Sequence, residues 1–74
     1  MARAEPAADD YFYELLTEEE AADFLGYTPR ALQNWRYRGG GPQYVRISGR
    51  AVRYRRSDLI AWCDSQLEDN TSRF

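Results

Sequence analysis

Two threonines eleven residues apart each mark the start of a short helix, and this spacing constrains the fold more than any other feature. Thr17 can cap a helix N-terminus, and Glu20 three residues later completes a capping box. Gly26 ends this first helix, and Thr28 followed by Pro29 begins a second one almost at once. Two short helices joined by a glycine-containing turn predict a helix-turn-helix.

After the second helix the chain changes from helical to strand patterning. The run Gly39-Gly40-Gly41-Pro42 ends the helix, and residues 43–47 and 51–55 have strand character on either side of a tight turn, Ser48-Gly49-Arg50. We therefore expect a hairpin. In one alternation its core face carries Val45, Ile47, Val52 and Tyr54, and its other face carries Arg46, Arg53 and Arg55. A register shift of one residue would exchange the two faces.

A third helix is expected to begin at Ser57 as the N-cap and to fade near Glu68. Cys63 falls on its apolar side, where we expect a small core residue. The fold class is thus α+β: a winged helix-turn-helix of three short helices with a two-stranded hairpin wing, in residues 11–68. Tyr11, Phe12 and Tyr13 would form a lead-in strand or cap the core. Residues 1–10 are expected to be a disordered acidic tail and residues 69–74 a flexible tail.

The net charge of −2 conceals a very uneven distribution of charge. Residues 30–56 contain eight arginines and no acidic residue, whereas residues 1–29 contain eight acidic residues and one arginine. A basic block of this kind indicates a polyanionic partner. The alternative is a solvated surface balanced by the acidic flanks, although solubilising surfaces usually mix both signs. Every cation is arginine, which binds phosphate and guanine through paired hydrogen bonds.

The composition argues against catalysis. There is no histidine and only one cysteine, so Ser-His-Asp and Cys-His catalysis and a Cys/His zinc site are excluded. The triple glycine follows a helix, whereas phosphate-binding glycine loops follow a strand. We expect no enzyme, no metal and no cofactor. Because no apolar run approaches a membrane span and no secretory signal is visible, we expect a cytoplasmic protein with no membrane partner.

On a helical wheel, the polar side of the second helix suits base reading. It lies opposite the apolar pair Leu32 and Trp35. Arginine pairs with guanine, and glutamine or asparagine pairs with adenine, in the major groove of DNA. The helix N-terminus can also hold a phosphate. An ordinary solvent-facing side would look similar, but together with the basic block we expect major-groove contacts from Thr28, Arg30, Gln33, Asn34 and Tyr37.

The hairpin supplies a second set of candidate DNA contacts. A loop tip that carries arginine can enter a minor groove, where negative potential is concentrated. For each wing arginine the alternative to a minor-groove contact is a contact with a DNA phosphate or no contact with DNA at all. For Arg55 and Arg56 the alternative is an internal salt bridge. We expect wing, minor-groove and phosphate contacts from Arg36, Arg38, Arg46, Ser48, Gly49, Arg50, Arg53 and Arg55.

Three segments occur in order between residues 15 and 62: LLTEEEAADFLG, TPRALQNWR and GPQYVRISGRAVRYRRSDLIAW. In this combination the chain resembles the excisionase-like branch of the MerR-type winged helix-turn-helix superfamily. The resemblance implies a small phage or prophage excisionase, also called a recombination directionality factor, in a bacterial host. Such proteins bend DNA near an attachment site and direct a phage integrase toward excision. It also implies that Arg30, Gln33 and Asn34 enter the major groove and the wing around Arg50 enters the minor groove.

Two other functions remain open at this point. Transcriptional regulators of phage or prophage genes share the same domain, so the chain could be one of them. It could also be a protein-interaction adaptor whose arginine block meets an acidic partner. In the leading hypothesis the partners are double-stranded DNA, an integrase and neighbouring copies of the protein, because the acidic residues 1–29 can meet the basic surface of the next copy on DNA.

Overall fold

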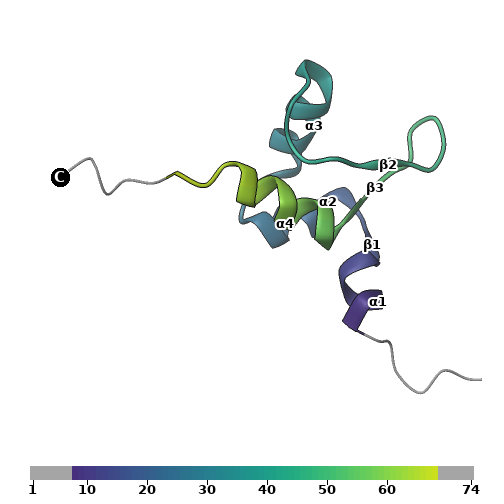
Figure 1. Ribbon diagram of the computed structural model, residues 1–74. Helices are drawn as coiled ribbons and strands as arrows, with labels where there is room; N and C mark the ends of the chain where they lie inside the picture. Colours follow the sequence, from purple (N-terminus) through teal and green to yellow (C-terminus); the bar gives the residue numbers. More distant parts are fainter. Residues whose placement is uncertain (1–7, 69–74) are drawn as a thin grey trace, which may run out of the picture.

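Four helices and three short strands make up the fold along residues 8–68, the part of the chain that the computed structural model describes (Figure 1). In chain order they are α1 (Ala8–Tyr13), β1 (Leu15–Leu16), α2 (Glu18–Leu25), α3 (Pro29–Arg38), β2 (Val45–Arg46), β3 (Val52–Arg55) and α4 (Arg56–Ser65). The strands form an antiparallel sheet in the order β1-β3-β2. The fold is a winged helix-turn-helix of the α+β class, as predicted, with one helix and one strand more than expected. The flexible tail expected at 69–74 and residues 1–7 of the acidic tail lie outside the described residues.

The two helices of the helix-turn-helix begin and end where the sequence places them. The Thr17 Oγ1 accepts the backbone N–H of Glu20 at 3.1 Å, and the Glu20 carboxylate accepts the backbone N–H of Thr17 at 2.9 Å. Gly26 ends α2 in the left-handed conformation, with φ 72°. The Thr28 side chain then caps α3 by accepting the N–H of Ala31 at 3.2 Å. These local bonds satisfy N–H groups that a helix N-terminus leaves without a partner.

The hydrophobic core joins the helix-turn-helix to the sheet and to α4. It consists of side chains from five elements, of which Leu32, Tyr54 and Leu59 are the largest that are fully buried. Leu25 and Trp35 pack against it from the edge. The buried residues of this core cluster are Leu16, Ala21, Ala22, Leu32, Val52, Tyr54 and Leu59. The core thus draws on β1, α2, α3, β3 and α4.

We define the wing as residues 45–55. Its strands pair in the alternative register, in which the side chains of β2 point to the faces opposite to those expected. Val45 lies opposite Arg53, and Arg46 lies opposite Val52. Opposite residues of an antiparallel pair share a face, so the expectation that Val45 and Ile47 face the core with Val52 and Tyr54 is wrong. Ile47 is 53% exposed, whereas Val52 is 8% exposed. The turn decides the register here, because β2 is only two residues long and carries little apolar patterning.

The N-terminal segment also differs from the sequence-based expectation. Residues 8–10, expected in the disordered tail, lie in α1, and Tyr11, Phe12 and Tyr13 continue this helix and do not form a strand. The strand follows at β1. Arg56 of α4 holds the end of α1, donating to the Tyr11 carbonyl oxygen at 2.8 Å and to the Glu14 carboxylate at 2.6 Å. Long-range contacts of this kind override weak local patterning.

Helix α4 corrects two smaller expectations. It begins at Arg56, with Arg55 at the N-cap position and no side-chain cap, so Ser57 is not the N-cap. Asp58 instead accepts a hydrogen bond from Arg55 Nε at 2.7 Å. Cys63 is exposed and is not part of the core. Leu59 and Trp62 already supply the apolar contacts of this short helix, which leaves Cys63 on the outer side.

The turn after α3 carries the tightest backbone approach among the described glycines. Gly41 has φ 78°, and a Cβ built on it would lie 2.5 Å from the Cβ of Trp35. We expect Gly41→Ala to lower the free energy of unfolding by about 2–4 kcal/mol, because it adds a left-handed alanine and an overpacked contact. Urea denaturation measures this difference.

Gly40 provides the matched control for that substitution. It has φ 89°, but a Cβ there meets nothing within 4 Å. Gly40→Ala should therefore show only the backbone cost of about 1–2 kcal/mol. Equal losses for the two variants would mean that the approach to Trp35 contributes nothing.

Candidate nucleic-acid interface

Helix α3 presents the side chains that the helical wheel predicts to be outward. Arg30, Gln33 and Asn34 are exposed, and Tyr37 is 93% exposed, the most exposed of the large hydrophobic residues described. Leu32 on the opposite side is fully buried. Four polar or aromatic side chains therefore stand on one outer side of a helix whose inner side is anchored.

An aromatic stack fixes α3 against its neighbours. Trp35 stacks on Tyr27 with ring centroids 5.2 Å apart and planes 11° apart. The same indole meets Trp62 of α4 at 4.7 Å. Aromatic pairs at these separations add stability beyond the area that they bury. The outer side of α3 is thus held at a set angle to the rest of the molecule.

A groove of about 430 Å³ lies between α3 and the wing. It brings Gln33 and Tyr37, predicted to enter a major groove, beside Arg46, Gly49 and Arg50 of the wing. Because Arg46 shares the face of Val52, it points into this groove and not to the face of Arg53 and Arg55. A helix and a loop tip separated by an open groove have the geometry with which a recognition helix and wing straddle a duplex.

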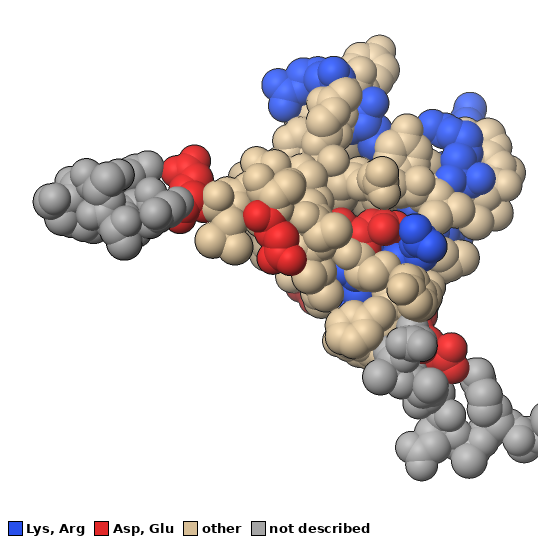
Figure 2. Space-filling model, in the orientation of Figure 1, with Lys and Arg blue, Asp and Glu red and all other residues tan. Residues whose placement is uncertain are grey.

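The positive charge gathers on the same part of the surface. Figure 2 shows arginine atoms over α3 and over the wing loop, with most of the visible carboxylates lower on this face. In residues 8–68, Arg30, Arg38 and Arg50 make no ion pair, so their charges are available to a polyanion. Such a surface attracts DNA phosphates independently of sequence.

Three of the eight arginines in residues 30–56 pair with carboxylates within the described part of the chain. Arg36 contacts Glu18 at 2.8 Å, Arg55 contacts Asp58 at 2.7 Å, and Arg56 contacts Glu14 at 2.6 Å. For Arg55 and Arg56 this is the internal salt bridge that the sequence left open. The structure thus does not bring Arg55 to the groove.

Two more wing arginines have backbone partners. Arg53 Nη1 donates to the carbonyl oxygen of Val52 at 2.9 Å, on the face away from the groove. Arg46 Nη1 donates to the carbonyl oxygen of Gly49 at 2.8 Å, and its guanidinium lies 5.7 Å from the ring centroid of Tyr44. Arg46 therefore braces the loop tip on which Ser48, Gly49 and Arg50 are exposed.

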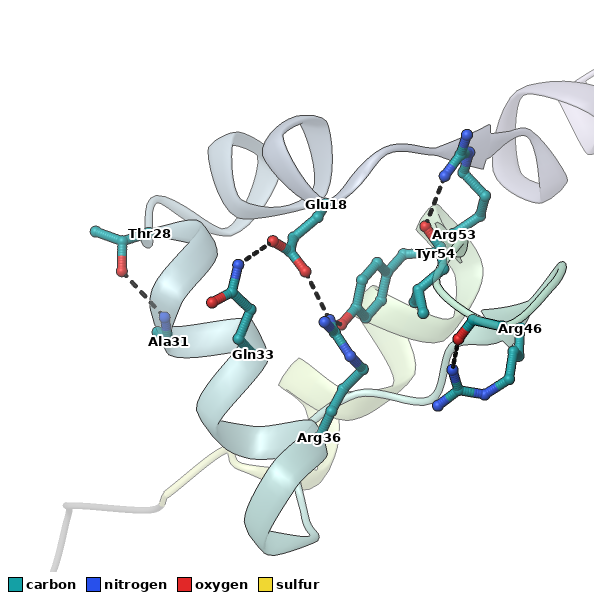
Figure 3. A network of polar contacts seen from close by, with 10 residues as sticks. Glu18, Thr28, Ala31, Gln33, Arg36, Arg46, Arg53 and Tyr54 are labelled. Carbon is teal, nitrogen blue, oxygen red and sulfur yellow. Dashed lines mark hydrogen bonds and ion pairs between the residues drawn. The ribbon is translucent and has the colours of Figure 1, made fainter.

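A polar network crosses from α2 to α3 and β3 beneath the groove (Figure 3). Glu18 Oε2 accepts from Gln33 Nε2 at 2.6 Å, and Glu18 Oε1 pairs with Arg36 Nη1. Arg36 also donates to the Tyr54 hydroxyl oxygen at 2.8 Å. Sequence reasoning missed Glu18, because no local pattern shows that the start of α2 crosses the middle of α3.

The network shifts the pKa values of Arg36 and Tyr54. Burial alone would lower the pKa of Arg36, but its hydrogen bonds to Tyr54 and Glu18 outweigh burial and raise that pKa. Burial raises the pKa of Tyr54, so its hydroxyl stays neutral and can accept from Arg36. Arg36 is therefore a charged group that is already engaged inside the protein and is not a free phosphate ligand.

Among residues 8–68 no group of histidine, cysteine, aspartate and glutamate side chains is placed to hold a metal ion. No helix in that range has both the length and the apolar character needed to cross a bilayer.

The fold, the anchored outer side of α3 and the basic groove together define a DNA-binding helix-turn-helix protein. A family model described as "Helix-turn-helix domain" matches residues 15–66, from β1 to just beyond α4. The chain belongs to this helix-turn-helix domain family, and DNA is its partner. No curated protein matches the chain.

Proposed function

We propose that the protein binds specific sites in double-stranded DNA and acts through binding, without catalysis. In this proposal α3 enters the major groove with Arg30, Gln33, Asn34 and Tyr37, and the wing tip with Arg50 enters the adjacent minor groove. The observation that carries the proposal is the groove in which Gln33 and Tyr37 face Arg46 and Arg50. Electrophoretic mobility shift of the purified protein on genomic fragments at low salt tests it. Absence of binding would favour an adaptor for an acidic protein.

We propose further that this DNA binding serves site-specific recombination. The protein would bind near an attachment site in the cytoplasm of a bacterial host, bend the DNA and direct a phage integrase toward excision. The resemblance of the three segments between residues 15 and 62 to excisionases supports this role. The exposed acidic residues Glu19 and Asp23 of α2 do not line the basic groove, which would let neighbouring copies meet with opposite charges along the DNA.

Footprinting separates this role from a transcriptional regulator, which uses the same domain. An excisionase should protect several adjacent sites and bend the fragment, which circular-permutation gels detect. A regulator should instead protect one operator that overlaps a promoter, and that result would replace the excisionase proposal with the regulator.

Arg30→Ala should weaken binding to the specific site by about 1–3 kcal/mol, because a bidentate contact to guanine is worth about that much discrimination. Arg30 is exposed near the N-terminus of α3, the part of a recognition helix that reads bases. Fluorescence anisotropy on specific and random duplexes measures both affinities.

Arg38→Ala is the comparison for this substitution, because Arg38 is exposed at the other end of α3. A phosphate contact there should be lost equally on specific and random DNA. If Arg30→Ala also lowered the two affinities equally, Arg30 would not be a base reader.

A further inference from the structure

We infer that Glu18 is a positioning residue that sets the base preference of Gln33 by fixing the orientation of its side-chain amide. The inference rests on the proposed function, in which Gln33 reads a base in the major groove. It goes beyond that function because it assigns DNA sequence preference to a carboxylate on the helix that precedes the recognition helix.

The first step concerns how firmly the Glu18 carboxylate is held. Its two oxygens have different partners, Gln33 Nε2 at 2.6 Å and Arg36 Nη1 at 2.8 Å. Its side chain is only 18% exposed, and Arg36 is itself bonded to the Tyr54 hydroxyl. Arg36 therefore compensates the charge of the Glu18 carboxylate, and each of its two oxygens is held by a hydrogen-bond or ion-pair partner. This negative group lies beside a surface that attracts polyanions.

The second step concerns what the carboxylate imposes on Gln33. An ionised carboxylate only accepts hydrogen bonds, so the NH₂ end of the amide must face Glu18 and the oxygen must face away. Figure 3 shows this arrangement, with the Gln33 nitrogen directed to Glu18 and its oxygen turned from it. An exposed glutamine without such a partner would exchange its two ends freely. Gln33 is exposed, so Glu18 supplies the constraint.

The third step concerns the hydrogen-bonding groups of Gln33 that remain available to a DNA base. The anchored amide keeps its oxygen as an acceptor and one N–H as a donor. Adenine presents an N6 donor beside an N7 acceptor in the major groove, and this pattern matches the pair. Guanine presents two acceptors, N7 and O6, and cannot satisfy the oxygen. Because Glu18 sets the orientation of the Gln33 amide in the free protein, the loss of side-chain conformational entropy on binding DNA is smaller. The orientation that is set favours adenine over guanine.

The test compares Glu18→Ala and Gln33→Ala with the wild-type protein on a selected duplex. The duplex is obtained by selection from a randomised pool, and every base pair is then substituted in turn. Gln33→Ala identifies the base pair that Gln33 reads. At that base pair, Glu18→Ala should reduce the preference for adenine over guanine by about fivefold or more, since a good bidentate pair is worth about 1–3 kcal/mol. Preferences at other positions should change less.

Glu19→Ala is the matched control. It removes the same charge from the same first turn of α2, but Glu19 is exposed and makes no hydrogen bond or ion pair with α3 among the described side chains. Glu18→Gln is the second variant, because it keeps the shape of the side chain if the alanine variant unfolds. A neutral amide no longer dictates which end of Gln33 faces it, so Glu18→Gln should also relax the preference.

Three outcomes decide the inference. Relaxed preference at the Gln33 base pair in the Glu18 variants, with Glu19→Ala unchanged, supports it. Unchanged preference in the Glu18 variants, or an equal loss of affinity for all duplexes, overturns it and leaves Glu18 with a structural role only. If the wild-type protein binds every duplex alike, site-specific binding itself fails, and the inference fails with it.

Discussion

Leu32→Ala is expected to remove most of the free energy of unfolding at 25 °C. Leu32 is fully buried where α3 meets the core. Truncation of a buried leucine costs about 2–5 kcal/mol, and a domain of this size has only about 3–5 kcal/mol of stability to lose. Circular dichroism with urea denaturation measures the fraction folded, and DNA binding should fall with it.

Leu67→Ala is the control for this prediction, because Leu67 is 75% exposed beyond the end of α4. Its effect on the free energy of unfolding should stay within about 0.5 kcal/mol. A Leu32→Ala protein that kept the wild-type urea midpoint would show that α3 is not held by this side chain.

Affinity for DNA should fall about 500-fold when salt rises from 50 to 200 mM. If five of the arginines neutralise phosphates, log K falls with log salt with a slope of about −4.5. Within residues 30–56, five arginines have no carboxylate partner among the described residues: Arg30, Arg38, Arg46, Arg50 and Arg53. A salt titration by anisotropy on one duplex gives the slope.

Two variants test which arginines contribute to that slope. Arg50→Ala should make it shallower by about 1, because Arg50 is exposed at the wing tip and has no ion pair in the described structure. Arg55→Ala should leave it unchanged, since Arg55 is already paired with the Asp58 carboxylate. A slope near zero for the wild-type protein would remove electrostatic attraction as the basis of binding.

The parts of the fold that the sequence predicted are those set by neighbouring residues. Thr17, Gly26 and Thr28 act on backbone groups within a few residues of themselves, so their positions alone place the ends of α2 and the start of α3. The alternation of Leu32 with exposed polar residues likewise predicted which side of α3 is buried.

The parts that the sequence did not predict depend on contacts across the chain. Helix α1 is bonded to Arg56, 45 residues after Tyr11, and its six residues are too few to form a stable helix alone. The wing register follows from its turn, so the side of Arg46 could not be decided from alternation. Of the candidate DNA contacts, Arg36 and Arg55 belong to the same basic block of the sequence as Arg50, and the structure shows that carboxylates already bind the first two.

The contact between Trp35 and Trp62 has a practical consequence. These are the two tryptophans of the sequence, and they meet where α3 rests on α4. The near-ultraviolet circular dichroism and the fluorescence of this tryptophan pair therefore report on the packing of α3 against α4, without an added label. Any ligand or substitution that tilts α3 would change this optical signal, while events confined to the wing would leave it unaltered.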